Sequence, residues 1–478
     1  MKKTKIVCTL GPACEDDKVL ENIILSGADV LRINFSHGDH AYHKKNADRV
    51  KALRKRLGLY TPLLLDTKGP EVRIKHFKSS PVTLESGREF RFYLYDRDGD
   101  ESGVSVTHAR LNRDISVGDR VLVDDGLIEM RVEKILSEEI VCKVINGGVL
   151  HNGKGVNLPG IRLSLDFLSQ KDKDDIAFAV REDFDFIAAS FTQCADDILS
   201  IRRHLESLGS RNIHVIAKIE SASGVANIDE ILEVSDGVMV ARGDLGVEIP
   251  LEEIPVIQKS IIKKAYSAGK PVITATQMLE SMTHNPRPTR AEICDVANAI
   301  YDGSSAIMLS GETAIGEYPV EAVRTMAKIA LRTEGDINYI SRFSRVSEHG
   351  ADITSAVSHA ACQAAIDLGA SVIIAVSESG YTPRMLSRFR PATSILGCSP
   401  TEKSCRQLML SWGVTPVKTD EVDSTDKLFE NAAAKALESG LVHSGELALV
   451  VAGTPLKTSG TTNMLKAITL GDTESPIA

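Results

Sequence analysis

The sequence is poor in the features that mark several large classes of protein. Aromatic residues make up only 5% of its 478 residues, and the single tryptophan is Trp412. Acidic residues outnumber basic ones by 65 to 56, and this net charge of −9 argues against nucleic acid or an anionic membrane as the main partner. No apolar run approaches the length of a membrane span, and Gly11-Pro12 breaks the first apolar run too early for a secretory signal.

Zinc motifs and the common nucleotide motifs are also lacking. The eight cysteines form no Cys-x-x-Cys pair, so free thiols in a reducing cytoplasm are expected. The sequence has no His and Cys cluster with zinc-binding spacing, no P-loop, and no Rossmann glycine pattern followed by an acidic residue. Hydrophobic residues make up 43% of the chain, enough to build cores for about three domains.

What the sequence does contain is a series of eight short β-branched runs that alternate with helical patterns. Most are nearly continuous apolar segments, which is typical of parallel strands buried on both faces. Eight such units favour a (β/α)8 TIM barrel over an open doubly wound sheet. The runs cover residues 4–10, 30–36, 62–66, 186–191, 213–220, 237–244, 271–276 and 305–311.

One long segment interrupts this alternation after the third strand. Residues 70–160 show no helical period and contain short alternating runs with Gly-Asp, Asp-Gly and Gly-Gly turns, which predicts a small inserted β-barrel. It lies at the end of a barrel strand, where active sites occur, so it is either a lid or a tolerated surface insertion. The predicted domains are a barrel (1–69 and 161–345), an inserted all-β lid (70–160) and a C-terminal open α/β domain (346–478).

Polar residues gather where five of the predicted barrel strands end. Side chains at the C-terminal ends of such strands face the substrate. A helix cap or a rim ion pair explains any single one of them, but five strand ends together predict a site. These residues are Arg32, Asn34, Ser36 and His37; Asp66, Thr67, Glu71 and Arg73; Lys218 and Glu220; Arg242, Gly243 and Asp244; and Thr276 and Gln277.

Two carboxylates and three cations stand out within this set. Glu220 and Asp244 come from adjacent strands, and two hard oxygen ligands suit Mg²⁺ or Mn²⁺ bridging a phosphate. The alternative is a structural ion pair between Glu220 and Lys218 or Arg242. Arg32, Arg73 and Lys218 supply the positive charge that an anionic substrate needs. A further set of oxygen donors either holds a monovalent cation or forms a hydrogen-bonded rim: Asn34, Ser36, Asp66 and Thr67.

At these residues the sequence resembles the pyruvate kinase family. The likeness runs over essentially the whole chain and is greatest to bacterial members; an extra C-terminal domain, which some of them carry, is expected to be absent after Ala478. The matching segments are 31-LRINFSHG-38, 65-LDTKGPEVR-73, 121-VLVDDGLI-128, 154-KGVNLPG-160, 217-AKIE-220, 240-VARGDLGVEIP-250, 274-TATQMLESM-282 and 286-PRPTRAE-292.

The resemblance implies a phosphotransferase that converts phosphoenolpyruvate and ADP into pyruvate and ATP, the last step of glycolysis. It also implies Mg²⁺ (or Mn²⁺) and K⁺ as cofactors, a cytoplasmic location and a homotetramer. Glu71 resembles the glutamate of potassium-dependent members, where potassium-independent members carry lysine.

The resemblance further implies a role for each site residue. Lys218, Arg32, Arg73 and Thr276 are the implied catalytic residues, and Glu220 and Asp244 are the implied magnesium ligands. The other implied sets are the substrate-binding residues Arg32, Gly243, Asp244 and Thr276, the nucleotide-binding residues Asn34, His37, Arg73 and Lys154, and the potassium ligands Asn34, Ser36, Asp66 and Thr67.

The C-terminal domain contains two loops rich in Ser, Thr and Gly, 377–382 and 458–463, and the first leads into a predicted helix with three arginines. This pattern suits a phosphate, and the family's allosteric sugar-phosphate site lies in this domain. A regulatory phosphate of a sugar or nucleotide effector is therefore expected on the first loop, although ordinary helix capping is the alternative. Its predicted ligands are Ser377, Ser379, Gly380 and Thr382.

Two other functions remain open at this stage. A barrel lyase or aldolase acting on a pyruvate-type substrate would also use a metal-bound enolate, but it would need neither the lid nor Lys154. A non-catalytic sugar-phosphate sensor would use the C-terminal domain alone, and would be favoured if Lys218, Glu220 or Asp244 were missing.

Overall fold

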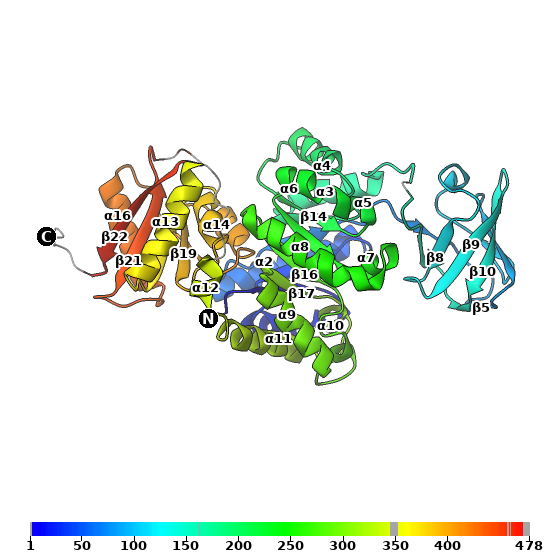
Figure 1. Cartoon of the computed structure of the whole chain (residues 1–478), viewed down its shortest axis with the longest axis horizontal. Helices are drawn as coiled ribbons and strands as arrows, with labels where there is room; N and C mark the ends of the chain where they lie inside the picture. The colour runs from blue at the N-terminus through cyan, green and yellow to red at the C-terminus, as the bar shows by residue number, and fades with distance from the viewer. Residues whose placement is uncertain (1, 162, 345–351, 457, 459, 472–478) are drawn as a thin grey trace.

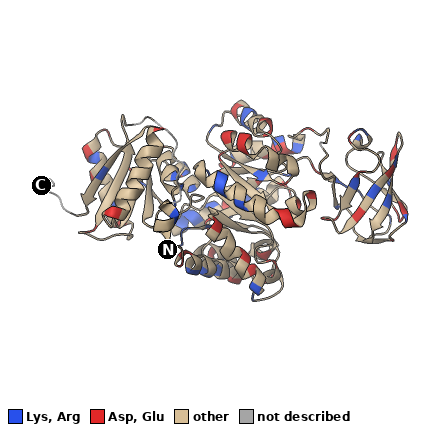
Figure 2. Cartoon of the chain, in the orientation of Figure 1, with Lys and Arg blue, Asp and Glu red and all other residues tan. Residues whose placement is uncertain are grey.

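The computed structural model describes residues 2–161, 163–344, 352–456, 458 and 460–471. Figure 1 shows three parts in a row: an inserted β domain, a central barrel and a C-terminal α/β domain. Lys and Arg are interspersed with Asp and Glu over all three parts, as Figure 2 shows. No helix of the described residues combines the length and the apolar character needed to cross a bilayer.

The central part is a closed barrel of eight parallel strands, which confirms the predicted TIM barrel. The strands close in the order β1-β17-β16-β15-β14-β13-β3-β2. Apolar side chains such as Leu64, Met239 and Met308 fill its interior. The strands are β1 (Lys5–Thr9), β2 (Val30–Asn34), β3 (Leu63–Asp66), β13 (Phe186–Ala189), β14 (His214–Ile219), β15 (Gly237–Ala241), β16 (Val272–Ala275) and β17 (Ala306–Leu309).

Helices form the outer ring of the barrel. Capping explains several of their ends: the Asp39 carboxylate accepts a hydrogen bond from the Tyr42 N–H at the start of α2, and Gly58 ends that helix with φ of 65°. The ring consists of α1 (Asp17–Leu25), α2 (His40–Leu57), α3 (Gln170–Arg181), α4 (Ala195–Ser207), α5 (Ala222–Ala226), α6 (Ile228–Val234), α7 (Arg242–Glu248), α8 (Ile254–Ser267), α9 (Arg290–Asp302), α10 (Gly311–Ala314) and α11 (Pro319–Glu334). The next helix, α12 (Tyr339–Ser344), packs through Phe343 into the core of the C-terminal domain.

The inserted domain is all β, as predicted. Its seven-stranded sheet has the order β4-β12-β8-β9-β10-β6-β7, and a bridge between Ile74 and Val106 joins the two edges, so the sheet curls on itself. β11 and β5 form a second, two-stranded sheet. The strands are β4 (Val72–Arg73), β5 (Val82–Leu84), β6 (Glu89–Tyr93), β7 (Gly103–Ser105), β8 (Arg120–Val123), β9 (Ile128–Ile135), β10 (Glu139–Asn146), β11 (Gly148–Leu150) and β12 (Gly155–Asn157).

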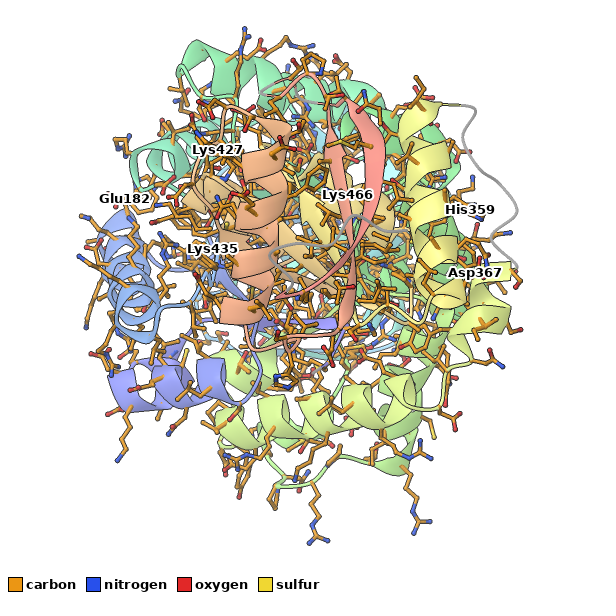
Figure 3. All side chains as sticks on the ribbon, turned by 90° about the vertical axis from the view of Figure 1, so that its left-hand side faces the viewer. Glu182, His359, Asp367, Lys427, Lys435 and Lys466 are labelled. Atoms are coloured by element: carbon orange, nitrogen blue, oxygen red, sulfur yellow. The ribbon has the colours of Figure 1, made fainter. Side chains whose placement is uncertain are left out.

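The C-terminal domain is the predicted open α/β unit. Its five strands have the order β20-β19-β18-β21-β22, and only β22 is antiparallel. Figure 3, which turns this domain toward the viewer, shows α16 and α13 on either side of the β21–β22 pair. The elements are α13 (Ile353–Asp367), β18 (Val372–Val376), α14 (Tyr381–Ser387), β19 (Ser394–Ser399), α15 (Glu402–Leu408), β20 (Val414–Lys418), α16 (Thr425–Glu438), β21 (Leu447–Gly453) and β22 (Thr462–Thr469).

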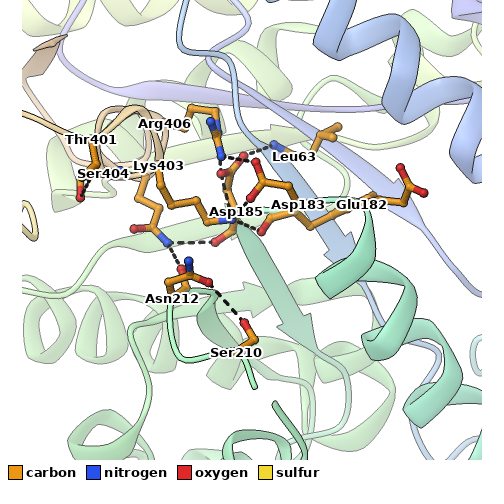
Figure 4. Close-up of polar contacts among 12 residues, drawn as sticks. Leu63, Glu182, Asp183, Asp185, Ser210, Asn212, Thr401, Lys403, Ser404 and Arg406 are labelled. Atoms are coloured by element: carbon orange, nitrogen blue, oxygen red, sulfur yellow. Dashed lines mark hydrogen bonds and ion pairs between the residues drawn. The ribbon is translucent and has the colours of Figure 1, made fainter. Parts of the chain in front are cut away.

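A buried ion-pair cluster joins this domain to the barrel, as Figure 4 shows. The Asp185 side chain, just before β13, is completely buried and accepts a 2.7 Å hydrogen bond from Arg406 Nε on α15. The same carboxylate accepts a bond from the Leu63 N–H, and Lys403 Nζ lies 3.4 Å away. Arg406 also pairs with Asp183 at 2.7 Å. A carboxylate from the barrel is therefore neutralised mainly by the C-terminal domain.

We expect the substitution Arg406→Met to lower the free energy of unfolding by about 3 kcal/mol, because it leaves Asp185 buried with much less compensating charge. The matched control is Arg203→Met, whose guanidinium pairs at 3.0 Å with Asp196, a side chain that is 76% exposed. An exposed pair contributes about 0–1 kcal/mol. Urea unfolding of both variants measures the difference. Equal losses of stability would show that the interdomain pair contributes no more than a surface pair.

Candidate active site

A lysine held by three acceptors lies at the C-terminal ends of β3, β13 and β14. Lys218 Nζ is 3.1 Å from Asp66 Oδ1, 2.9 Å from Glu220 Oε1 and 2.8 Å from Ser190 Oγ. All four side chains are almost completely buried. Burial lowers the pKa of Lys218, but Asp66 and Glu220 more than offset this effect, so its pKa lies well above the ordinary value. The ammonium is therefore a permanent positive charge in this site.

Asp66 connects this lysine to a buried arginine. Arg32 Nε donates a 2.6 Å hydrogen bond to Asp66 Oδ2, and one of its terminal nitrogens donates to Thr9 Oγ1 at 2.9 Å. Burial raises the pKa of Asp66, but Arg32 and Lys218 outweigh it and hold the pKa below its usual value. Arg32 and Lys218 thus each contact a different oxygen of the Asp66 carboxylate, which holds both cations in place.

Glu220 and Asp244 form a pair of carboxylates beside Lys218. Burial raises the pKa of the Glu220 carboxyl to about 7 against the pull of Lys218, and Asp244 adds to the rise. Burial likewise raises the pKa of Asp244. Two adjacent carboxylates that favour protonation are a donor set suited to a divalent cation, which would restore charge on both. Within the described residues, three or more His, Cys, Asp or Glu side chains nowhere gather into a metal-binding group, so this site would be completed by substrate or water.

The structure corrects the expected position of Asp244. The strand predicted over 237–244 ends at Ala241, and Arg242, Gly243 and Asp244 form the first turn of α7. Arg242 does not pair with Glu220: it bonds Asp295 at 2.7 Å and donates to the Thr276 carbonyl at 2.6 Å. Arg242 therefore holds α7 against the end of β16.

Thr276 follows β16 in a strained conformation. Its φ is 67°, in the left-handed region that a β-branched residue rarely adopts. Its Oγ1 accepts a 2.9 Å bond from the Gly243 N–H and donates at 2.6 Å to the Ala275 carbonyl. The hydroxyl is thus fixed beside the first turn of α7.

The four oxygen-donor residues predicted to hold a monovalent cation lie together at the ends of β2 and β3. Asn34 is paired with Asp66 across the two strands, and the Ser36 N–H donates to Asn34 Oδ1 at 3.0 Å. Thr67 Oγ1 accepts a 3.1 Å bond from the Ser190 N–H. The set is therefore gathered by the strand register next to the Lys218 cluster.

Two predicted nucleotide-binding residues form ion pairs within the inserted domain. Arg73 Nε bonds Glu71 Oε2 at 2.7 Å, and Lys154 Nζ bonds Asp124 Oδ1 at 2.7 Å. Glu71 lies close enough to the carboxylate pair to be one of the charges that raise the pKa of Asp244. A cavity of about 230 Å³ lies between the inserted domain and the barrel, lined by Glu71, Phe191 and Glu248 among others.

The predicted effector loop lines a cavity of about 100 Å³ in the C-terminal domain. Ser377 and Thr382 lie on its wall, and Thr382 Oγ1 is 2.6 Å from Thr462 Oγ1. None of the described residues that line it is Lys or Arg. Of the three arginines predicted in the following helix, Arg384 lies in α14 and donates to the Ser379 carbonyl of the loop at 3.1 Å. Arg390 lies beyond the end of this helix and donates to the Gly303 carbonyl of the barrel at 2.9 Å.

Ser190 and the backbone of Phe191 are the site groups that the sequence did not predict. The Phe191 N–H donates a 2.6 Å bond to Glu220 Oε2. Ser190 ends the fourth barrel strand, so the rule applied to five other strand ends would have found it. A single serine after an apolar run carries little signal by itself.

Comparisons with known proteins agree with this geometry. Residues 1–323 match the family described as "Pyruvate kinase, barrel domain", and residues 355–468 match "Pyruvate kinase, alpha/beta domain". The pyruvate kinases of Staphylococcus saprophyticus and Staphylococcus aureus are each 48% identical over 475 residues, covering 99% of this chain and 81% of theirs. A solved pyruvate kinase from Cryptosporidium parvum superposes with a TM-score of 0.92 at 37% identity, over 98% of this chain and 96% of that one.

The protein is a phosphotransferase whose polar site lies at the C-terminal ends of a parallel barrel. The chain belongs to the pyruvate kinase family, in its bacterial form.

Proposed function

We propose that this chain transfers the phosphoryl group of phosphoenolpyruvate to ADP, giving pyruvate and ATP in the last step of glycolysis. The observation that carries this proposal is the Lys218 ammonium, held by Asp66, Glu220 and Ser190 beside the buried Glu220–Asp244 pair. Phosphoryl transfer depends on positioning and on stabilising charge, and this site offers fixed cations next to a place for a divalent ion.

Glu220 and Asp244 would hold Mg²⁺ or Mn²⁺, and their raised pKa values support this assignment. Magnesium bound there would neutralise charge on the phosphate and on the enolate oxygen as the bond to phosphorus breaks. Lys218 and Arg32 supply the protein's own positive charge to the equatorial oxygens of the phosphoryl group. Gly243, which has no side chain and lies in the first turn of α7, would let substrate approach Asp244.

The enolate left behind must accept a proton at carbon. Thr276 is a poor acid, and its hydroxyl already donates to the Ala275 carbonyl. We therefore assign Thr276 the role of orienting a water or relay, with its strained backbone fixing that hydroxyl relative to Gly243.

Asn34, Ser36, Asp66 and Thr67 would hold K⁺, which would add one more positive charge beside the reacting phosphate. We assign the nucleotide to Asn34 and His37 on the barrel and to Arg73 and Lys154 on the inserted domain. The ion pairs Arg73–Glu71 and Lys154–Asp124 would open when the nucleotide phosphates take their place. Closure of the inserted domain over the site would exclude water and so prevent hydrolysis of the donor.

We further propose regulation by a phosphorylated effector on Ser377, Ser379, Gly380 and Thr382. The cavity beside Ser377 and Thr382 supports this site, and hydroxyl and backbone N–H groups would bind the phosphate. The double variant Ser379→Ala/Thr382→Ala is expected to abolish the shift in phosphoenolpyruvate half-saturation caused by sugar phosphates or AMP, typically five- to 150-fold for allosteric ligands. An unchanged shift would rule out this loop.

Members of the family are usually homotetramers, and we propose that this chain also forms a homotetramer, located in the cytoplasm.

The first experiment measures pyruvate formation from phosphoenolpyruvate and ADP with Mg²⁺, in potassium and in sodium buffer of equal ionic strength. Much higher activity in potassium supports both the reaction and the K⁺ site. Equal activity in the two buffers supports the proposed reaction but contradicts the proposed K⁺ site. A folded protein that is inactive in both buffers, with sugar phosphates added, would be better explained as a sensor.

A further inference from the structure

Ser190 has no role in the chemistry assigned above, yet its side chain lies at the centre of the site. It follows β13 directly and is 2% exposed. Lys218 Nζ donates a 2.8 Å hydrogen bond to its Oγ, which is the shortest of the three contacts that the ammonium makes. A buried serine in contact with the proposed catalytic lysine calls for a functional explanation.

The Ser190 side chain also contacts the proposed potassium ligands. Its Oγ lies 2.7 Å from the Thr67 carbonyl and 3.1 Å from Asp66 Oδ1, and its N–H donates to Thr67 Oγ1 at 3.1 Å. A hydroxyl has one proton to donate. Because Lys218 occupies an acceptor position on Oγ, the Ser190 proton is directed to Thr67 or Asp66. One hydroxyl therefore connects the lysine to two members of the potassium set.

The three acceptors of the Lys218 ammonium differ in kind. Asp66 and Glu220 are charged, and each belongs to a proposed cation site, so their attraction for the ammonium changes when a cation binds. Ser190 is neutral, and its position is fixed by Thr67 and the end of β13. Because its hydroxyl is held by Thr67 and Asp66, two proposed potassium ligands, the direction of this acceptor depends on how that set is arranged.

We propose that Ser190 is a positioning residue for the phosphoryl transfer: its hydroxyl fixes the Lys218 ammonium relative to Asp66 and Thr67, and thereby links potassium binding to the position of the catalytic lysine. This inference rests on the proposed function. Without the hydroxyl, the ammonium is drawn only by carboxylates and loses its alignment with the potassium set. Potassium would then bind less tightly and activate less.

The test compares Ser190→Ala with Ser190→Thr, which keeps the hydroxyl, and with a matched control. Thr192 lies two residues further along, is completely buried, and donates its hydroxyl to the Ala189 carbonyl at 2.9 Å, away from Lys218. Thr192→Val therefore removes a neighbouring buried hydroxyl without touching the site. For each protein, kcat, KM and the potassium concentration for half-activation are measured. The rise in melting temperature on replacing NaCl by KCl is measured without substrates.

We expect Ser190→Ala to lose roughly 10- to 100-fold in kcat, the size of effect that a displaced catalytic group produces. Its half-activating potassium concentration should rise severalfold, and its potassium-dependent melting shift should shrink. Ser190→Thr should recover most of the potassium response, while Thr192→Val should keep all of it. If crowding prevents Ser190→Thr from folding, Ser190→Cys, a weaker hydrogen-bonding group of similar size, should fall between Ala and wild type.

Three results would overturn the inference. Ser190→Ala could keep the wild-type kcat, or lose kcat with an unchanged potassium response, or behave like Thr192→Val in every measurement. A wild-type enzyme equally active in potassium and sodium would also overturn it. These outcomes differ from failure of the proposed function, in which the wild type itself forms no pyruvate from phosphoenolpyruvate and ADP.

Discussion

The substitution Lys218→Met is expected to lower kcat by roughly 100- to 1,000-fold, the cost of removing one preorganised charge-stabilising group. Methionine keeps the length and much of the packing of the lysine stem but removes the ammonium. The loss should fall mainly on kcat, because the charge that Lys218 stabilises develops as the phosphoryl group moves. Steady-state pyruvate formation over a range of phosphoenolpyruvate concentrations separates kcat from KM.

Lys264→Met is the matched control for this experiment. Lys264 lies on α8 of the same barrel, and its ammonium pairs with Asp229, a side chain that is 74% exposed. Its removal should leave kcat unchanged. If Lys218→Met also kept kcat within about threefold while remaining folded, the lysine would be structural, holding Asp66 and Glu220 together, and the assignment of its catalytic role would fail.

The second large effect concerns potassium. Wild-type activity is expected to be roughly 10- to 100-fold higher in potassium than in sodium, a range typical of linked ligands. Glu71→Lys should bring this ratio close to one, because an ammonium near the site would supply the charge that the ion otherwise brings. The substitution also removes the 2.7 Å pair between Glu71 and Arg73 and leaves Arg73 with its 2.7 Å bond to the Gly153 carbonyl.

The control for Glu71→Lys reverses a charge elsewhere in the inserted domain. Glu85 pairs with Arg88 at 3.2 Å, and its side chain is 69% exposed, so Glu85→Lys changes the net charge equally without approaching the site. It should keep the wild-type potassium ratio. Equal ratios for wild type and Glu71→Lys, measured at constant ionic strength, would contradict the role given to Glu71.

The strands of the barrel were predictable because each is a short apolar run bounded by turns. The boundary at 241 was not, since Arg242, Gly243 and Asp244 continue an extended-looking segment in the sequence but form the first turn of α7, where Arg242 pairs with Asp295. Asp66 shows a similar limit. Its place at a strand end was evident, but its pairing with both Arg32 and Lys218 depends on the register of four neighbouring strands, β2, β3, β13 and β14. Sequence spacing within one strand cannot supply that information.

One of the sequence segments that resembles the family most specifically shapes the structure around the site. The segment 286–292 contains Thr289 and Glu292, which cap the start of α9 by bonding to each other's backbone N–H groups. Glu292 also accepts bonds from the Ser281 N–H and hydroxyl, which fixes the loop after Thr276. A motif can therefore identify a family reliably through residues that shape the site without entering it.

The ion pair between Asp185 and Arg406 has a consequence for the order in which the protein is made. The two residues are 221 positions apart in the chain. At a synthesis rate of about 5–20 residues per second, the nascent barrel carries Asp185 for roughly 10–45 s before its main cationic partner exists. During that interval the nearest cation to Asp185 is Arg54 of the barrel, whose guanidinium lies 3.8 Å away. A chain truncated before residue 406 would therefore leave Asp185 with this more distant partner, and we expect its barrel to be less stable than the barrel of the full chain.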